Sequence, residues 1–233
     1  MNRYHLLFFL GFGLLIGACS TETAKKPADK TSTPPVATAA PTLNESEKES
    51  PKTILFFGNS LTAAYGLDPQ QGFVGLIDQR IDSLGLNYEV INSGLSGETT
   101  AGGNSRVEWI LEHHAIDIFI LELGGNDALR GLNVTQSTEN LQAIIDKVKN
   151  KFPEAKIILA GMLAPPNMGP TFSQQFAEMY PRLAKANELA LIPFLLDGVG
   201  GVPELNLPDG IHPNVAGHRI VTENIWTILQ PLL

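Results

Sequence analysis

Five short apolar runs, separated by longer segments with helical periodicity, constrain the fold of this chain more than any other feature. Each run is largely apolar without strict alternation, which is typical of strands buried on both faces of a sheet. The runs span residues 54–57, 88–91, 116–121, 156–160 and 191–195. They predict five strands in the interior of an α/β domain.

Apolar residues recur at helical spacing between and after these runs. One such stripe consists of Leu141, Ile144, Ile145, Val148 and Phe152, which share one face of a helix. Further stripes lie within residues 107–111, 172–183 and 215–229. Pro181 falls inside one stripe, where we expect the helix to kink or restart, and Pro213 suits the first turn of the last helix.

Strands that alternate with helices form a parallel sheet with helices on both of its faces. We therefore expect an α/β fold, a three-layer α/β/α sandwich with a central, mostly parallel five-stranded sheet. Ligands bind such sheets at the carboxyl ends of the strands. Ser60, Gly94 and Asn126 each follow one of the first three predicted strands, so the three residues should lie at one edge.

Two short motifs carry the side chains of a serine hydrolase. Gly58-Asn59-Ser60-Leu61 follows the first strand, and Asp209-Gly210-Ile211-His212 precedes the last helix. Ser60 is the candidate nucleophile, His212 the base, and Asp209 the carboxylate that orients the imidazole. Of the five histidines, only His212 has a carboxylate three residues before it on a turn, which Gly210 permits. As alternatives, Ser60 and Asp209 could be caps of the helices near them.

These motifs, together with two others, resemble the blocks of the GDSL/SGNH hydrolase family. The G-x-S-x-G elbow of α/β-hydrolases is absent. The blocks occur in the family's order over about residues 53–233: Gly-Asn-Ser-Leu, Gly94 after the second strand, Gly124-Gly125-Asn126-Asp127, and Asp-x-x-His. Residues 58–66, 97–99, 123–131 and 209–214 resemble the bacterial multifunctional thioesterase/lysophospholipase/arylesterase subgroup. The resemblance implies the SGNH-hydrolase, flavodoxin-like arrangement.

The resemblance also implies an oxyanion hole. Its donors would be the backbone N–H groups of Ser60 and Gly94 and the side-chain amide of Asn126. As alternatives, Gly94 could be an ordinary strand-end turn and Asn126 a loop residue with left-handed backbone. We expect Asp127 to order the loop or cap a helix rather than act as a second base.

Asn59 departs from the family pattern, which has aspartate before the serine. Asparagine keeps the shape of aspartate and one carbonyl acceptor but loses the charge. We expect the triad to be spared, because Asp209 supplies the orienting carboxylate. How the loop is held and how the pH profile is set stay open at this point.

The N-terminus resembles that of an exported lipoprotein. Residues 1–18 have Arg3 followed by an apolar stretch at 6–16 that is too short to span a bilayer. Ile16-Gly17-Ala18-Cys19 resembles a lipobox, so we expect cleavage before Cys19 and lipidation of that residue. A transmembrane anchor or an ordinary signal peptide is the alternative. Cys19 is the only cysteine, which excludes an intramolecular disulfide.

Composition divides the rest of the chain into a tether and a domain. Residues 19–51 are rich in Thr, Pro, Ala, Lys, Glu and Ser and predict a disordered tether. Residues 52–233 have the length of one domain. The formal net charge of −8, without a basic run in the domain, argues against nucleic-acid binding. We expect membrane attachment only through the lipid anchor, on the periplasmic or cell-surface side.

The sequence therefore predicts a lipid-anchored extracytoplasmic serine esterase. The resemblance implies aryl, short or medium acyl, lysophospholipid or thioester substrates, an acyl-enzyme intermediate, and no metal or cofactor. Two alternatives stay open: a carbohydrate O-deacetylase of the same family, and a non-catalytic lipoprotein that binds acyl chains or cell-wall fragments. Residues 164–170, with Phe172 nearby, could form an apolar acyl wall or simply a proline-stiffened loop.

Overall fold

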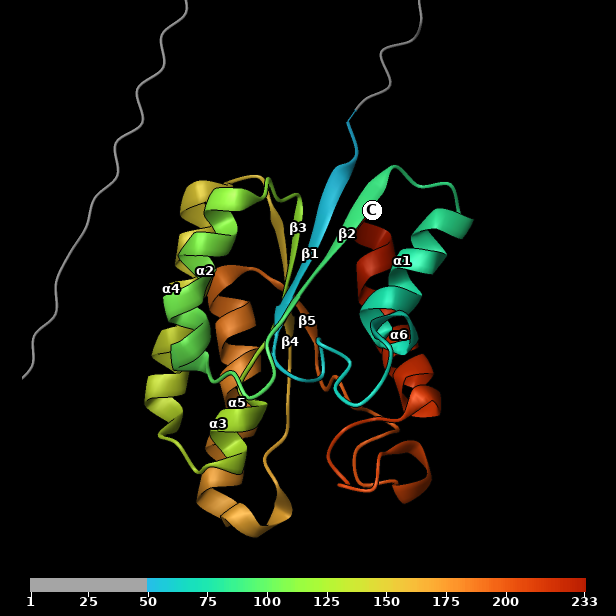
Figure 1. The fold of residues 1–233 in the computed structure, drawn as a ribbon. Coiled ribbons are helices and arrows are strands. Elements are labelled where there is room, and N and C mark those ends of the chain that lie inside the picture. The colour runs from blue at the N-terminus through green and yellow to red at the C-terminus, as the bar shows by residue number, and fades with distance from the viewer. Residues whose placement is uncertain (1–49) are drawn as a thin grey trace, which may run out of the picture. The chain divides into compact units, whose positions relative to one another are not determined.

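A computed structural model describes residues 50–233, which contain a five-stranded sheet in the order β2-β1-β3-β4-β5 (Figure 1). All four strand pairings are parallel. The strands are β1 (Lys52–Gly58), β2 (Tyr88–Gly94), β3 (Ile118–Glu122), β4 (Lys156–Ala160) and β5 (Ala190–Ile192). The predicted central parallel sheet is confirmed, and its number of strands agrees with the five apolar runs.

Helices cover both faces of this sheet. Figure 1 shows α2, α4 and α5 on one face and α1 and α6 on the other, with α3 near the carboxyl ends of the strands. The α-helices are α1 (Phe73–Ser83), α2 (Thr100–His113), α3 (Gly125–Leu129), α4 (Val134–Lys151), α5 (Pro170–Asn187) and α6 (Val215–Leu229). Short 3₁₀ turns occupy Pro69–Gln71, Pro166–Met168, Pro203–Leu205 and Gln230–Leu232. The predicted three-layer α/β/α sandwich is therefore confirmed.

The central strands are apolar because both of their faces are covered. Ile54, Leu55 and Phe57 of β1 are fully buried, as are Phe119 and Leu121 of β3. The outer strand β2 is only partly buried, which fits the mixed character of its sequence. Burial on two faces, rather than strand propensity alone, explains the continuous apolar runs.

Two local features differ from the expected boundaries. β5 ends at Ile192, before Pro193, because proline cannot donate a ladder hydrogen bond. Pro181 does not interrupt α5, which continues from Pro170 to Asn187. Within residues 50–233, no helix combines the length and apolar character needed to cross a membrane.

The strand register sets the position of the site. Gly58, the last residue of β1, pairs with Gly94 of β2 on one side and with Glu122 of β3 on the other. A Cβ atom at Gly94 would lie 2.4 Å from the backbone nitrogen of Ala63. The turn after β1 therefore packs directly over the end of β2, and the glycine is needed for this close approach.

His218 of α6 forms a hydrogen bond with the first residue of α1, and both helices lie on the face of the sheet opposite α4 (Figure 1). Its ring is buried, and its Nδ1 accepts a hydrogen bond from the Phe73 N–H at 3.1 Å. Burial, and to a lesser extent the charge of His212, lower the pKa of His218 from 6.5 to about 4. His218 is thus a packed residue that stays neutral in the folded protein at neutral pH.

We expect His218 to destabilise the fold on acidification. Because its folded pKa lies below the unfolded value, stability should be lost as the pH falls from 6.5 toward 4, by at most about 3 kcal/mol. His218→Asn keeps an acceptor near the Phe73 N–H but removes the titration, so its unfolding free energy should change less over this range. Denaturant unfolding at both pH values measures the difference. Equal pH slopes in the two proteins would contradict this account.

Candidate active site

Ser60 lies in a tight turn directly after β1. The turn is closed by hydrogen bonds from the Ala63 N–H to the Asn59 carbonyl at 3.0 Å and from the Tyr65 N–H to the Ser60 carbonyl at 2.9 Å. No α-helix begins here, since α1 starts only at Phe73. Ser60 therefore does not cap a following α-helix, and its hydroxyl is available for another role.

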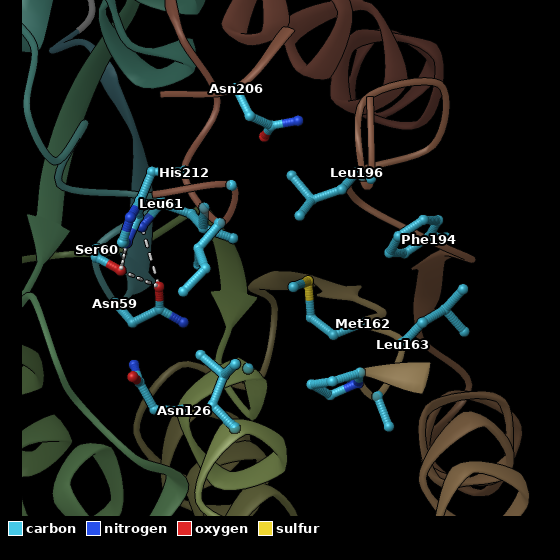
Figure 2. Close-up of a pocket in the computed structure, with 18 of the residues that line it drawn as sticks. Asn59, Ser60, Leu61, Asn126, Met162, Leu163, Phe194, Leu196, Asn206 and His212 are labelled. Atoms are coloured by element: carbon cyan, nitrogen blue, oxygen red, sulfur yellow. Dashed lines mark hydrogen bonds between the residues drawn. The ribbon is translucent and has the colours of Figure 1, made fainter. Parts of the chain in front are cut away.

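The sheet and the last loop bring the three predicted triad residues together. The Ser60 Oγ lies 2.9 Å from His212 Nε2, and His212 Nδ1 lies 2.7 Å from Asp209 Oδ2. An ionised carboxylate only accepts hydrogen bonds, so Nδ1 carries the proton and Nε2 is free to accept one from Ser60. Figure 2 shows the His212 ring directed at Ser60. The arrangement is that of a nucleophile, a general base and an orienting carboxylate.

Asp209 orients both the loop and the ring. Its Oδ1 accepts hydrogen bonds from the backbone N–H groups of Ile211 at 2.9 Å and His212 at 3.0 Å. Gly210 between them has a φ of +68°, in the left-handed region that glycine adopts readily. Desolvation raises the pKa of Asp209, but the hydrogen bonds from His212 and Ile211 outweigh it and lower the pKa from 3.8 to about 2. Asp209 is therefore ionised at neutral pH.

Tyr65 is a neighbour of the triad that the sequence analysis did not identify. Its ring packs against the His212 ring with 4.5 Å between the centroids, and about half of its surface is exposed. The imidazole therefore packs against an aromatic ring in addition to its hydrogen-bond contacts with Ser60 and Asp209. Tyr65 lies within residues 58–66, one of the blocks that carry the family resemblance, but only the fold shows that its ring reaches His212.

Asn126 extends from α3 toward the turn that carries Ser60. Its Nδ2 donates a hydrogen bond to the Glu98 carbonyl at 3.0 Å, which leaves its second amide hydrogen free. In Figure 2 the amide end of Asn126 is directed toward Asn59 and Ser60. This position fits the predicted donor to an oxyanion.

Gly94 differs from the expected oxyanion donor. Its N–H already donates to Asn92 Oδ1 at 3.0 Å, and the Asn92 Nδ2 donates to the Thr62 carbonyl at 2.9 Å. The structure therefore supports the alternative that Gly94 is a strand-end turn residue, kept small by the contact with Ala63. A backbone N–H engaged in this way is not available to an oxyanion in the present arrangement.

Gly97 offers a second backbone donor in the same loop. It has a φ of +84° and is exposed, and its N–H has no hydrogen-bond partner among residues 50–233. The next residue, Glu98, supplies the carbonyl that holds Asn126. Gly97 belongs to the Gly97-Glu98-Thr99 block that carries the family resemblance, whereas Gly94 lies at the end of β2.

Asp127 has the structural role expected of it. Its carboxylate accepts hydrogen bonds from the Thr100 N–H at 2.9 Å, the Thr100 hydroxyl at 2.5 Å and the Ser137 hydroxyl at 3.0 Å. These bonds tie α3 to the first turns of α2 and α4. The residue next to Asn126 is thus held by buried contacts, and Asp127 takes no position beside Ser60.

An apolar pocket of about 690 Å³ opens beside the triad. Figure 2 shows Leu163 and Phe194 on the far side of this pocket from Ser60. Its apolar lining includes Leu61, Leu129, Met162, Leu163, Ala164, Pro165, Pro166, Phe194, Leu196 and Ile211. Residues 164–166 line the pocket, which agrees with the hypothesis of an apolar acyl wall at residues 164–170. Phe172 does not line the pocket. Among residues 50–233, no group of three or more His, Cys, Asp or Glu side chains is arranged to hold a metal ion.

A triad at the carboxyl edge of a parallel sheet, inside a three-layer α/β/α sandwich, defines a serine hydrolase of the SGNH type. The model of the GDSL-like lipase/acylhydrolase family matches residues 56–220, and the chain belongs to this family. It is therefore a serine hydrolase that acts on ester bonds.

Three relatives support this assignment. The chain is 40% identical to esterase TesA of Pseudomonas aeruginosa over 187 residues, which cover 80% of this chain and 92% of the relative. It is 33% identical to an arylesterase of Vibrio mimicus, over 75% of this chain and 86% of the relative. It is 32% identical to thioesterase 1/protease 1/lysophospholipase L1 of Escherichia coli, over 78% of this chain and 85% of the relative. The crystal structure of TesA superposes with a TM-score of 0.75 at 41% identity, over 78% of this chain and 100% of that chain.

We expect Asn126→Ala to lower kcat about 10²–10³-fold, because it removes one donor to the oxyanion while leaving the triad in place. KM should change little. Steady-state hydrolysis of p-nitrophenyl acetate measures both constants. Asn167→Ala, at an exposed position in the 3₁₀ turn Pro166–Met168 and outside the pocket lining, is the matched control. An unchanged kcat in Asn126→Ala would exclude the side chain as an oxyanion donor.

Proposed function

We propose that this protein hydrolyses carboxylic esters with an apolar acyl group, through a covalent intermediate on Ser60. The observation that carries the proposal is the apolar pocket beside the hydrogen-bonded Ser60–His212–Asp209 triad. A serine hydroxyl is a weak nucleophile until a base takes its proton. The triad supplies that base, and the pocket supplies a place for the acyl chain.

The reaction proceeds in two acyl-transfer steps. Ser60 Oγ attacks the ester carbonyl carbon while His212 Nε2 takes the hydroxyl proton, and the carbonyl oxygen becomes an oxyanion. His212 then gives the proton to the leaving alcohol or thiol, which departs as the acyl-enzyme forms. Water attacks the acyl carbon with the same proton relay and releases the acid. Asp209, ionised at neutral pH, stabilises the imidazolium in both steps.

The oxyanion is stabilised by donors from three segments. We assign the Ser60 N–H and the Asn126 amide as two of them, in agreement with the expectation from the sequence. For the third, the free and exposed N–H of Gly97 is better suited than that of Gly94, which donates to Asn92. Donors fixed before the reaction stabilise the developing charge without reorganisation.

The apolar lining of the pocket favours esters with longer apolar acyl chains over acetylated sugars. An acetyl group would leave most of a 690 Å³ apolar pocket unfilled. The relatives named arylesterase and thioesterase/lysophospholipase support aryl esters, acyl thioesters and lysophospholipids as substrate classes. The assembled triad argues against a lipoprotein that only binds acyl chains.

We further propose that the protein is exported and anchored to a membrane through lipidated Cys19, on the periplasmic or cell-surface side. The support is the N-terminal sequence, with its short apolar stretch and lipobox-like residues. Residues 1–49, which include Cys19 and most of the predicted tether, lie outside the described part of the chain. Acyl-CoA thioesters are cytoplasmic metabolites, so this location favours oxygen esters.

We expect Ser60→Ala to reduce hydrolysis of p-nitrophenyl esters to a small residual rate, because only binding and oxyanion stabilisation remain. Thermal unfolding should confirm that the variant is folded. Ser105→Ala, on the exposed surface of α2, is the control for serine removal. Turnover of Ser60→Ala at the rate of the unmodified protein would refute the assignment of the nucleophile.

We expect kcat/KM to rise about fourfold for each methylene added to the acyl chain, at about 0.8 kcal/mol per buried methylene, until the pocket is full. Leu163→Trp should narrow the pocket and lower kcat/KM for long chains more than for acetate. A series of p-nitrophenyl esters from acetate to palmitate measures the profile. Leu84→Trp, at a similarly exposed position outside the pocket, is the control. A profile that falls from acetate onward would favour the deacetylase alternative.

A further inference from the structure

Glu122 is a buried carboxyl group directly behind the nucleophile that the two acyl-transfer steps do not use. It is the last residue of β3, it pairs in register with Gly58, and only 2% of its surface is exposed. Its Oε1 accepts a hydrogen bond from Asn59 Nδ2 at 2.7 Å. Its Oε2 accepts one from the Asn59 N–H at 3.1 Å and one from the Thr62 hydroxyl at 2.8 Å. One side chain therefore holds both ends of the turn that carries Ser60.

Asn59 connects this carboxylate to the nucleophile. While its Nδ2 donates to Glu122, its Oδ1 accepts the Leu61 N–H at 3.0 Å and lies 3.3 Å from Ser60 Oγ. Figure 2 shows the Asn59 carbonyl directed at Ser60 and Leu61. The amide therefore has a fixed polarity, with its donor toward Glu122 and its acceptor toward the nucleophile.

The protonation state of Glu122 depends on its burial and on the groups packed around it. Burial raises the pKa of Glu122 from 4.5 to about 7, although the hydrogen bonds from Asn59 and Thr62 oppose the rise. Glu122 also interacts electrostatically with Tyr180 of α5, as does Asp127 of α3. Burial raises the pKa of Tyr180, and the charges of Glu122 and Asp127 raise it further, so this phenol stays neutral and donates to the Leu123 carbonyl. Asp127 is satisfied by Thr100 and Ser137.

An aspartate at position 59, as in the family motif, would place a second carboxyl within hydrogen-bond distance of Glu122. Two buried carboxyls at such a separation share one proton, since both cannot ionise together. That proton would reproduce the hydrogen bond that Asn59 makes, but only at pH values at which the pair retains it. Asn59 makes the same bond without a titratable proton.

We propose that Glu122 and Asn59 form a positioning pair for Ser60. The amide of Asn59 makes a hydrogen bond to Glu122 that an aspartate at position 59 could make only with a shared proton, and it thereby extends activity to alkaline pH. The pair acts on the esterase reaction proposed above and rests on it. Neither residue touches the ester. They fix the turn, so their loss should lower kcat much more than it raises KM.

The test exchanges the acid and the amide between the two positions. In Asn59→Asp, two carboxyls face each other, so kcat should fall as the pH rises through and above neutrality, while the unmodified protein keeps its activity. In Glu122→Gln, either orientation of the new amide sets one of its N–H groups against a donor of Asn59. We expect kcat to fall at least about tenfold above neutral pH, where Glu122 is ionised in the unmodified protein.

The double variant Asn59→Asp/Glu122→Gln should restore function. The amide introduced at position 122 can donate to the carboxylate introduced at position 59. Its carbonyl can still accept from the backbone N–H of position 59 and from Thr62. We expect kcat within about threefold of the unmodified protein, and the alkaline activity to return, because the pair again contains one acid and one amide.

Hydrolysis of p-nitrophenyl acetate over a pH series measures kcat and KM for the four proteins. Single variants with normal kcat and pH profile would overturn the proposal, as would a double variant no better than the product of the two single losses. Thermal unfolding of the same proteins at neutral and alkaline pH gives a readout independent of activity. If the unmodified protein hydrolysed no ester, the proposed function would fail. The recovery of unfolding temperature in the double variant would then still test the pair.

Discussion

The parallel register of β1 between β2 and β3 is the constraint on which the rest of this site depends. It sets Gly58 beside Gly94 on one side and Glu122 on the other. The chain then turns sharply, with Ala63 packed on Gly94 and Asn59 bonded to Glu122. These two contacts hold the turn that carries Ser60, and the loop before α6 brings His212 to Ser60 at hydrogen-bond distance. A shift of one residue in β1 would separate the nucleophile from its base.

The site contains one exposed carboxylic acid and one buried carboxylic acid, and their electrostatic environments differ. Asp209 lies near the surface, where hydrogen bonds from its own loop lower its pKa and keep it charged. Glu122 lies in the core, where desolvation raises its pKa against three hydrogen bonds. The first carboxylate can therefore respond to a charge that forms on His212, whereas the second fixes the geometry of the turn. Their different environments explain why two acids near one serine have different roles.

The sequence was sufficient to predict the fold and the triad, because both depend on local patterns. Buried parallel strands need continuous apolar runs, and Ser60, Asp209 and His212 lie in motifs that show their chemistry. The sequence was not sufficient for Gly94 and Glu122. Whether the Gly94 N–H is free depends on the side-chain orientation of Asn92, and the role of Glu122 depends on the register between β1 and β3. Such contacts between distant residues have no sequence pattern of their own.

The central claim, that Ser60 is the nucleophile activated by His212, is tested most directly by locating a covalent adduct. A fluorophosphonate reacts with an activated serine, and trypsin digestion followed by mass spectrometry identifies the labelled peptide. The peptide spanning residues 53–80 contains Ser60 as its single serine, whereas Ser93 and Ser96 lie in the peptide spanning residues 81–106. We expect one adduct, on the first peptide, and none in a His212→Ala variant. An adduct on the second peptide, or full esterase activity without any adduct, would contradict the account.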